Sequence, residues 1–249
     1  MDWFAGNLQW AFKDFGTPLR PENAIPYINQ KGVVDRSGRP KDAYFVFKSH
    51  WSEDPFAYIE SHTWTERQGE EDESHNVKVY SNVHSMVLVH NGKSLANKLR
   101  DKSSFPAQGL VWDIVFKEGP NILLAMGYDK DGNTVATDSI TVNYGIGSAG
   151  DPESVTWNRE RLPNGNILMT ASMVDKDGKL CSDHNEKVYF DLMGDGELYT
   201  SYGTMGRSAT IETASGKASI EIGPGKGKAT LELRSQNFKG AYFELNPKE

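Results

Sequence analysis

The sequence has little cysteine, a deficit of basic charge and no long apolar run, and each shortage excludes a class of protein. Cys181 is the only cysteine among 249 residues, so the chain can form neither an internal disulfide nor a thiolate metal cluster. Its 27 lysine and arginine residues are outnumbered by 34 aspartate and glutamate residues, a net charge of −7. This balance argues against binding to nucleic acid or to an anionic membrane surface. No apolar run approaches the roughly 20 residues that span a bilayer.

The sequence also lacks a secretory signal and a complete nucleotide-binding motif. Met1-Asp2-Trp3-Phe4 begins no basic region and no long apolar stretch. If the chain is a segment of a longer protein, this shortage says nothing about secretion, so the compartment is left open. The run GIGSAG at residues 145–150 has the letters of a dinucleotide fingerprint, but no helical pattern follows it. Because a pyrophosphate needs a helix N-terminus there, we expect an interdomain linker and no cofactor.

Residues 6–51 carry the clearest pattern in the sequence, which indicates a strand, a long loop and a helix. The apolar run at residues 8–12 is too short for a helix and suits a buried strand. A loop rich in proline and asparagine follows over residues 17–30. After Pro40, apolar residues recur at the spacing of one helix face, namely Ala43, Val46, Phe47 and Trp51. In a β/α barrel, the loop after such a strand lies on the catalytic face.

Beyond Trp51 the sequence predicts a mainly β protein. Alternating apolar and polar residues between turn residues are typical of half-buried strands, and Asn91-Gly92 favours a type I′ hairpin. About seven strands are expected of an immunoglobulin-like sandwich, and the sequence has room for two such sandwiches. The predicted strands lie at residues 57–60, 63–65, 77–81, 86–90, 93–96, 110–116, 122–126 and 135–142, and then at 167–174, 187–190, 210–213, 218–222, 229–234 and 241–245.

Turn signals separate these strands. Glycine-rich stretches at residues 194–196 and 223–225 are expected to be turns. The sequence YDKDG at residues 128–132 recurs as VDKDG at 174–178, which supports two sandwiches of similar architecture. Neither copy has the ligand spacing of an EF-hand, so we expect hairpin turns there and no metal site.

The residues quoted above carry a resemblance to a known family. The pattern GNxxW…DFG…NQKG…DRxGxPKDAYFxFKxxW within residues 6–51 resembles the last βα unit of the catalytic barrel in glycoside hydrolase family 2. That family contains β-galactosidases, β-glucuronidases and β-mannosidases. The remainder is similar to the C-terminal half of its long members, with two immunoglobulin-like domains in tandem. The resemblance implies the barrel end at residues 1–53, one sandwich at 54–145 and a second at 151–249.

The resemblance also implies three substrate-binding residues. Trp10 matches the tryptophan that lines the sugar subsite, where an indole presents a flat apolar face to a sugar ring; plain barrel core is the alternative. Asn29 matches an asparagine near the sugar and a bound sodium ion in β-galactosidase-like members. In β-glucuronidases, an Asn-x-Lys pair such as Asn29 and Lys31 binds the substrate carboxylate. Galactoside and uronide both stay open, as does a role for Lys31 in stabilising its own loop.

The two carboxyl groups that retaining hydrolysis requires are not found in the family's motifs here. In the family both are glutamates on earlier strands, and Asp2, Glu22 and Asp35 do not lie in those motifs. We therefore expect a C-terminal portion of a β-glycosidase that supplies no catalytic residue. Its partner would be a carbohydrate substrate, and its sandwiches would serve as scaffold or as a surface for homo-oligomers. The alternatives are a non-catalytic carbohydrate-binding module and a purely structural module.

Overall fold

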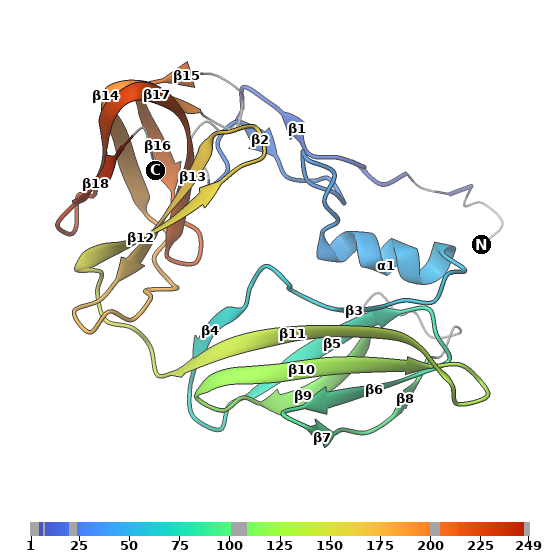
Figure 1. The fold of residues 1–249 in the computed structure, drawn as a ribbon. Helices are drawn as coiled ribbons and strands as arrows, with labels where there is room; N and C mark the ends of the chain where they lie inside the picture. Colours follow the sequence, from blue (N-terminus) through green and yellow to red (C-terminus); the bar gives the residue numbers. More distant parts are fainter. Residues whose placement is uncertain (1–4, 7, 20–23, 101–108, 200–204, 247–249) are drawn as a thin grey trace. The chain divides into compact units, whose positions relative to one another are not determined.

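The computed structural model describes residues 5–6, 8–19, 24–100, 109–199 and 205–246 (Figure 1). The chain forms two compact units. The first contains residues 1–13 and 31–148, and the second contains residues 14–30 and 149–249. Among the residues described, no helix is both long and apolar enough to cross a membrane. The expectation of a mainly β protein with sandwich-like sheets is confirmed.

The first unit is a β-sandwich whose two sheets enclose an apolar core. One sheet has the strand order β3-β5-β9, and the other has the order β4-β11-β10-β6-β7 with β8 paired to β6. Buried side chains from both sheets, among them Val79, Trp112, Leu88 and Leu123, form one cluster. The strands are β3 (Ala57–Ile59), β4 (Glu66–Gly69), β5 (Ser74–Ser81), β6 (Ser85–His90), β7 (Lys93–Ser94), β8 (Lys98–Leu99), β9 (Leu110–Val115), β10 (Gly119–Tyr128) and β11 (Thr134–Ile146).

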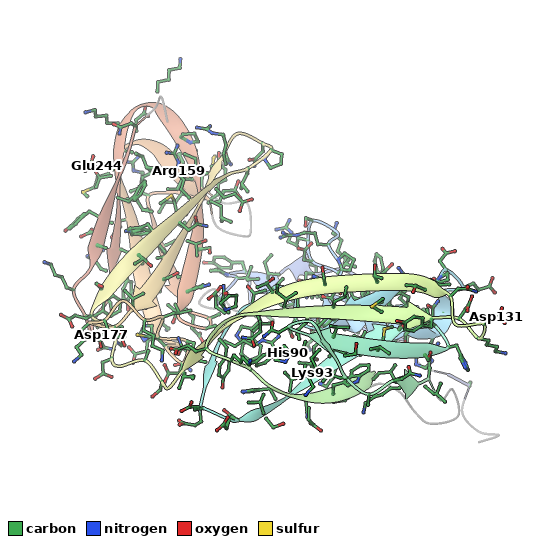
Figure 2. All side chains as sticks on the ribbon, turned by 60° about the horizontal axis from the view of Figure 1, so that its bottom comes forward. His90, Lys93, Asp131, Arg159, Asp177 and Glu244 are labelled. Carbon is green, nitrogen blue, oxygen red and sulfur yellow. The ribbon has the colours of Figure 1, made fainter. Side chains whose placement is uncertain are left out.

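Local sequence explains the turns of this unit. The hairpin between β6 and β7 forms because Asn91 and Gly92 both adopt positive φ angles, 48° and 80°, as a type I′ turn requires. Figure 2 shows His90 and Lys93 on either side of it. The strand predicted at residues 63–65 is wrong. The Trp64 N–H instead donates to the Ser61 carbonyl at 2.9 Å in a turn, and β4 begins only at Glu66.

Helix α1 (Asp42–Trp51) begins two residues after Pro40 and packs on the first sandwich through an unexpected face. The predicted face of Ala43, Val46, Phe47 and Trp51 is not the one that docks, because Ala43 is exposed and Trp51 is 77% exposed. The docking face contains Phe45 and Ser49 instead. The Phe45 ring stacks on Tyr58 of β3 and Ser49 is buried. The docking face also contains the polar residues Asp42 and Ser49, so the apolar pattern of the helix alone did not identify it. The aromatic partner Tyr58 on β3 decides which face docks.

The second unit is one sheet that folds over on itself around a core that includes Phe190, Ile222 and Leu231. Its strand order is β12-β13-β17-β14-β15, with β16 paired to β14 and β18 to β17. The strands are β12 (Ser154–Arg161), β13 (Ile167–Val174), β14 (Lys187–Tyr199), β15 (Met205–Gly206), β16 (Ser208–Glu212), β17 (Lys217–Arg234) and β18 (Ala241–Leu245).

Glycines let β14 and β17 bend instead of ending. The turns predicted at residues 194–196 and 223–225 are wrong, since both stretches lie inside continuous strands. Gly194 has φ +92°, and a Cβ there would lie 2.4 Å from the Lys228 carbonyl, so only glycine fits. The strand pairing shifts register at this point. The Asp195 carboxylate accepts hydrogen bonds from the Lys226 and Gly227 N–H groups at 2.7 and 2.8 Å, which holds the bend.

The two DKDG repeats are turns held by their first aspartate. The Asp129 carboxylate accepts from the N–H groups of Asp131 and Asn133, both at 2.9 Å. The Asp175 carboxylate accepts in the same way from Asp177 and Lys179. Figure 2 shows Asp131 and Asp177 on loops outside the sheets. The Asn133 side-chain amide, together with these backbone donors, lowers the pKa of Asp129. The Gly150 N–H, together with the Lys179 and Asp177 N–H groups, lowers the pKa of Asp175.

The compact units are divided at three points in the sequence: between Lys13 and Asp14, between Gln30 and Lys31, and between Ser148 and Ala149. Residues 31–53 group with the first sandwich, whereas residues 14–30 group with the second. The division into domains at residues 1–53, 54–145 and 151–249 stays a prediction.

Candidate functional site

Trp10 lies on an extended segment that runs along residues 31–34. The Ala11 N–H donates to the Lys31 carbonyl at 3.1 Å, and the Val33 N–H donates to the Ala11 carbonyl at 3.1 Å. Lys13 and Val34 form an isolated parallel bridge. The strand predicted at residues 8–12 is therefore wrong, because no regular ladder extends beyond these contacts in the described part of the chain. The peptide bond between Trp10 and Ala11 is cis.

The prediction that this segment is buried is also wrong. Leu8, Trp10 and Phe12 are 98%, 68% and 69% exposed. All three apolar side chains therefore lie at the surface, and Phe12 lines a groove together with Gln9. Val33 and Val34, along which the segment runs, are buried. The Trp10 indole is thus a solvent-facing aromatic surface, the property that a contact with a sugar ring requires, and it is not part of the core.

Asn29 lies in a short antiparallel pair of strands that closes the long loop. Strand β1 (Phe15–Gly16) pairs with β2 (Ile28–Asn29), so that Phe15 is opposite Asn29. The Thr17 N–H donates to the Tyr27 carbonyl at 2.9 Å. Ile28 is 2% exposed and Asn29 is half-buried. The hairpin thus fixes the backbone of Asn29.

Lys31 is exposed and its backbone carbonyl accepts the hydrogen bond from Ala11. The hydrogen bond from Ala11, the residue after Trp10, to the Lys31 carbonyl therefore brings the backbones of Trp10 and Lys31 close together within the first unit. The boundary of the compact units falls between Gln30 and Lys31, so Asn29 belongs to the second unit. The roles of Trp10, Asn29 and Lys31 in binding a substrate stay predictions.

A groove of about 580 Å³ lies beside helix α1 in the first unit. That volume is within the usual range for small-molecule sites. Its lining is mainly apolar and includes Phe12, Val33, Tyr44, Phe47 and Trp51. The predicted residues Trp10 and Lys31 do not line it. The groove therefore adds a mainly apolar surface next to the predicted sugar contacts along the chain, and Lys48 and Asp54 are the charged residues among its described lining.

The seam between α1 and β3 is a polar and aromatic cluster that the sequence did not reveal. The Asp42 carboxylate accepts hydrogen bonds from the Tyr58 hydroxyl at 2.8 Å and from the Ser61 N–H at 2.9 Å. The His62 ring stacks on Tyr58, and its Nε2 lies 2.7 Å from the Asp138 carboxylate. Desolvation, together with the hydrogen bond to Asp42, raises the pKa of Tyr58. An aspartate early in a helix was visible, but its partners come from distant strands.

This cluster predicts that Asp42 anchors the helix. In an Asp42→Asn variant one carboxylate oxygen is lost, and we expect α1 to lose about 1–2 kcal/mol of local stability. Amide hydrogen exchange across residues 42–51 should accelerate on the order of tenfold. Glu53→Gln, which changes an exposed carboxylate next to the helix, is the matched control and should leave exchange unchanged. Equal exchange in both variants would show that Asp42 does not hold α1.

Among the described residues, no group of three or more His, Cys, Asp or Glu side chains is placed to hold a metal ion. Asp35, a carboxylate close to the predicted site in sequence, is bound within its own turn by Ser37 and by Arg39 at 2.8–2.9 Å. Partial desolvation opposes ionisation, but these hydrogen bonds outweigh it and hold the pKa of Asp35 well below its usual range. Such a carboxyl group is a poor proton donor at neutral pH. Asp2 and Glu22 lie outside the described residues.

Known proteins resemble the chain over nearly its whole length. The family described as "Domain of unknown function (DUF4982)" matches residues 72–136. A Formosa agariphila protein named "Putative beta-glucuronidase" is 52% identical over 244 residues, which cover 97% of this chain and 30% of the relative. A β-galactosidase of Bacteroides ovatus is 25% identical and covers 100% of this chain and 29% of its own length.

A solved structure of a β-glucuronidase also resembles this chain. The crystal structure of Parabacteroides merdae β-glucuronidase, with glycerol in its active site, superimposes with a TM-score of 0.82 at 35% identity. The match covers 96% of this chain and 30% of that one. The chain thus spans about 30% of the length of the curated relatives that it matches.

Proposed function

We propose that this chain, whose homologues are β-glucuronidases and a β-galactosidase of glycoside hydrolase family 2, is the C-terminal part of a retaining β-glycosidase that acts on terminal β-glucuronides. One observation carries the choice of sugar. The relatives at 52% and 35% identity, each matched over nearly the whole chain, are both named for glucuronides. The sequence Asn29-Gln30-Lys31 supports the same choice, because the family resemblance assigns an Asn-x-Lys pair to the substrate carboxylate.

Each predicted residue has a distinct chemical role in this proposal. The exposed Trp10 indole would offer its flat face to the apolar side of the sugar ring. The Asn29 amide has both donor and acceptor atoms for sugar hydroxyls. The Lys31 ammonium would pair with the uronate carboxylate in a charge-assisted contact. The two catalytic carboxyl groups would come from the remainder of the enzyme.

A terminal β-galactoside is the second candidate, supported by the β-galactosidase of Bacteroides ovatus. A galactoside has no carboxylate, so it would use Trp10 and Asn29 but make no ion pair with Lys31. The sensitivity of Lys31 to substitution therefore discriminates the two sugars.

The test is a fusion in which this chain replaces the matched segment of Parabacteroides merdae β-glucuronidase. We expect Lys31→Ala to lower kcat/KM for an aryl β-glucuronide about 10- to 100-fold, the worth of one hydrogen bond between charged groups. Hydrolysis of an aryl β-galactoside by the same variant should change little.

The matched control removes the same charge elsewhere. Lys93 is exposed on β7 (Figure 2), and Lys93→Ala should leave both substrates unaffected. A loss of equal size for both sugars in Lys31→Ala would remove the glucuronide assignment, and a fusion that binds glucuronides normally without Lys31 would do the same.

A further inference from the structure

The loop that carries Asn29 belongs to the second unit. In the sequence, the whole first sandwich lies between this loop and the second sandwich. Residues 14–30 group with residues 149–249. Within the loop, Pro26 and Ile28 are buried, so the loop does not simply extend into solvent.

A cavity of about 200 Å³ marks where this loop meets the sandwich. Ala24, Ile25 and Pro26 line one part of it, and side chains of β13, β14, β16 and β17 line the rest. Three of these side chains form a row across neighbouring strands. Leu168 of β13 pairs with Glu221 of β17, and Glu221 pairs with Tyr199 of β14. Ile25 and Pro26 thus line the same cavity as this continuous row on the sheet, which we call the loop seat; Pro26 is buried there and Ile25 is 43% exposed.

The loop seat is held rigidly by its own neighbours. The Glu221 carboxylate accepts hydrogen bonds from the side-chain amides of Asn164 and Asn166 at 3.0 and 2.6 Å. Tyr199 lies against Gly223, where a Cβ would come within 2.5 Å of its ring. A glycine at this position therefore lets the tyrosine ring lie close to β17. These contacts fix the surface on which the loop rests.

Only a few residues separate the loop seat from Asn29. Two residues, Tyr27 and the buried Ile28, lie between Pro26 and Asn29, and the Thr17–Tyr27 hydrogen bond closes the hairpin at this point. An extended chain advances about 3.3 Å per residue, so the backbone between Pro26 and Asn29 is short. A displacement of Ile25 or Pro26 is therefore expected to move Asn29 as well. A misplacement of about 1 Å is enough to affect a reaction strongly.

We propose that the second sandwich is a positioning element for substrate recognition, in which the loop seat of Leu168, Glu221 and Tyr199 fixes Ile25 and Pro26 and so sets the place of Asn29. This rests on the proposed function, because it needs Asn29 to contact the sugar. Ile25, Pro26 and the loop seat are then positioning residues that do not touch the substrate. Their effect falls on how the sugar hydroxyls are held.

The first test measures hydrogen exchange in the full 249-residue chain. Leu168→Ser should accelerate exchange of the Thr17 amide about tenfold or more, because apolar burial stabilises the seated loop. Ile25→Ser should accelerate it less, because the Ile25 side chain is 43% exposed. The conservative Ile25→Val should restore slow exchange. Ser172→Ala changes β13 away from the loop seat and should leave the Thr17 amide unaffected. Unchanged exchange in both serine variants would overturn the loop seat.

The second test measures kinetics in the fusion with the Parabacteroides merdae enzyme. Leu168→Ser should raise KM for an aryl β-glucuronide about three- to tenfold while kcat stays within about twofold, the pattern of weakened ground-state binding. Faster exchange with an unchanged KM in an active fusion would overturn the positioning role and leave the proposed function intact. A folded fusion with the unsubstituted chain that hydrolyses no glucuronide would instead overturn the proposed function.

Discussion

The isolated chain is expected to hydrolyse neither aryl β-glucuronides nor aryl β-galactosides above the rate in buffer. Enzymes accelerate such reactions by about 10⁶-fold or more, and retaining hydrolysis obtains that acceleration from two carboxyl groups about 5 Å apart. The family places both on glutamates in motifs that this sequence does not contain. The roles proposed for Trp10, Asn29 and Lys31 are in binding the sugar, and none of these side chains is a carboxyl group that could serve in the catalytic pair.

Two carboxyl groups close to the predicted site in sequence, Asp35 and Asp42, are held by hydrogen bonds to neighbouring groups. Asp42 accepts hydrogen bonds from Tyr58 and Ser61, and Asp35 is held ionised inside its own turn. A general acid needs a pKa raised toward neutrality, which is the opposite of the shift at Asp35. Asp35 is therefore not suited to act as the acid, and the Asp42 carboxylate is engaged by Tyr58 and Ser61.

The measurement is a discontinuous assay with nitrophenyl glycosides at high protein concentration. The active fusion with the Parabacteroides merdae enzyme serves as the positive control. Hydrolysis by the pure chain that disappears when one of its own carboxylates, such as Asp35, is replaced by an amide would contradict the expectation. Such a result would place the catalytic pair inside this chain.

The second large effect concerns the core of the second unit. Phe190 on β14 is fully buried and lies 6.3 Å from Trp157, measured between ring centroids. Replacing a buried phenylalanine by alanine costs about 3–5 kcal/mol, a large part of the 5–15 kcal/mol that stabilises a typical domain. We expect Phe190→Ala to lower or abolish the thermal transition of the second unit. The transition of the first unit should remain.

Calorimetry checks this with a reciprocal variant. Leu88, fully buried in the first sandwich, gives the opposite pattern as Leu88→Ala, which should lower the transition of the first unit by about 2–5 kcal/mol of unfolding free energy. Phe190→Leu, which keeps most of the volume, should cost less than about 1.5 kcal/mol and leaves a measurable transition if the alanine variant does not fold. Transitions that shift together in both variants would contradict separate units and the linker predicted at residues 145–150.

Periodicity predicts strands well where one face of a strand is buried. In β10 and β13 buried and half-exposed residues alternate, and both strands were recognised in the sequence. The edge strand β12 was missed because only Val155 and Trp157 pack inward while its other positions are polar. The glycine-rich stretches at residues 194–196 and 223–225 were wrongly predicted to be turns for a different reason. Gly194 and Gly223 permit a bend and a close ring contact, and local sequence does not distinguish a bent strand from two strands and a turn.

The sequence by itself determined the class and the kinship of this protein. Alternating residues predicted sandwich-like sheets, and the pattern around Trp10, Asn29 and Lys31 identified the family resemblance, because local propensity and motif spacing are properties of neighbours along the chain. Only the tertiary structure decided that α1 docks through Phe45, that the Trp10 segment is exposed, and that residues 14–30 belong with the second sandwich. Each of these depends on contacts between residues far apart in sequence, and such contacts leave no periodic signal in either partner.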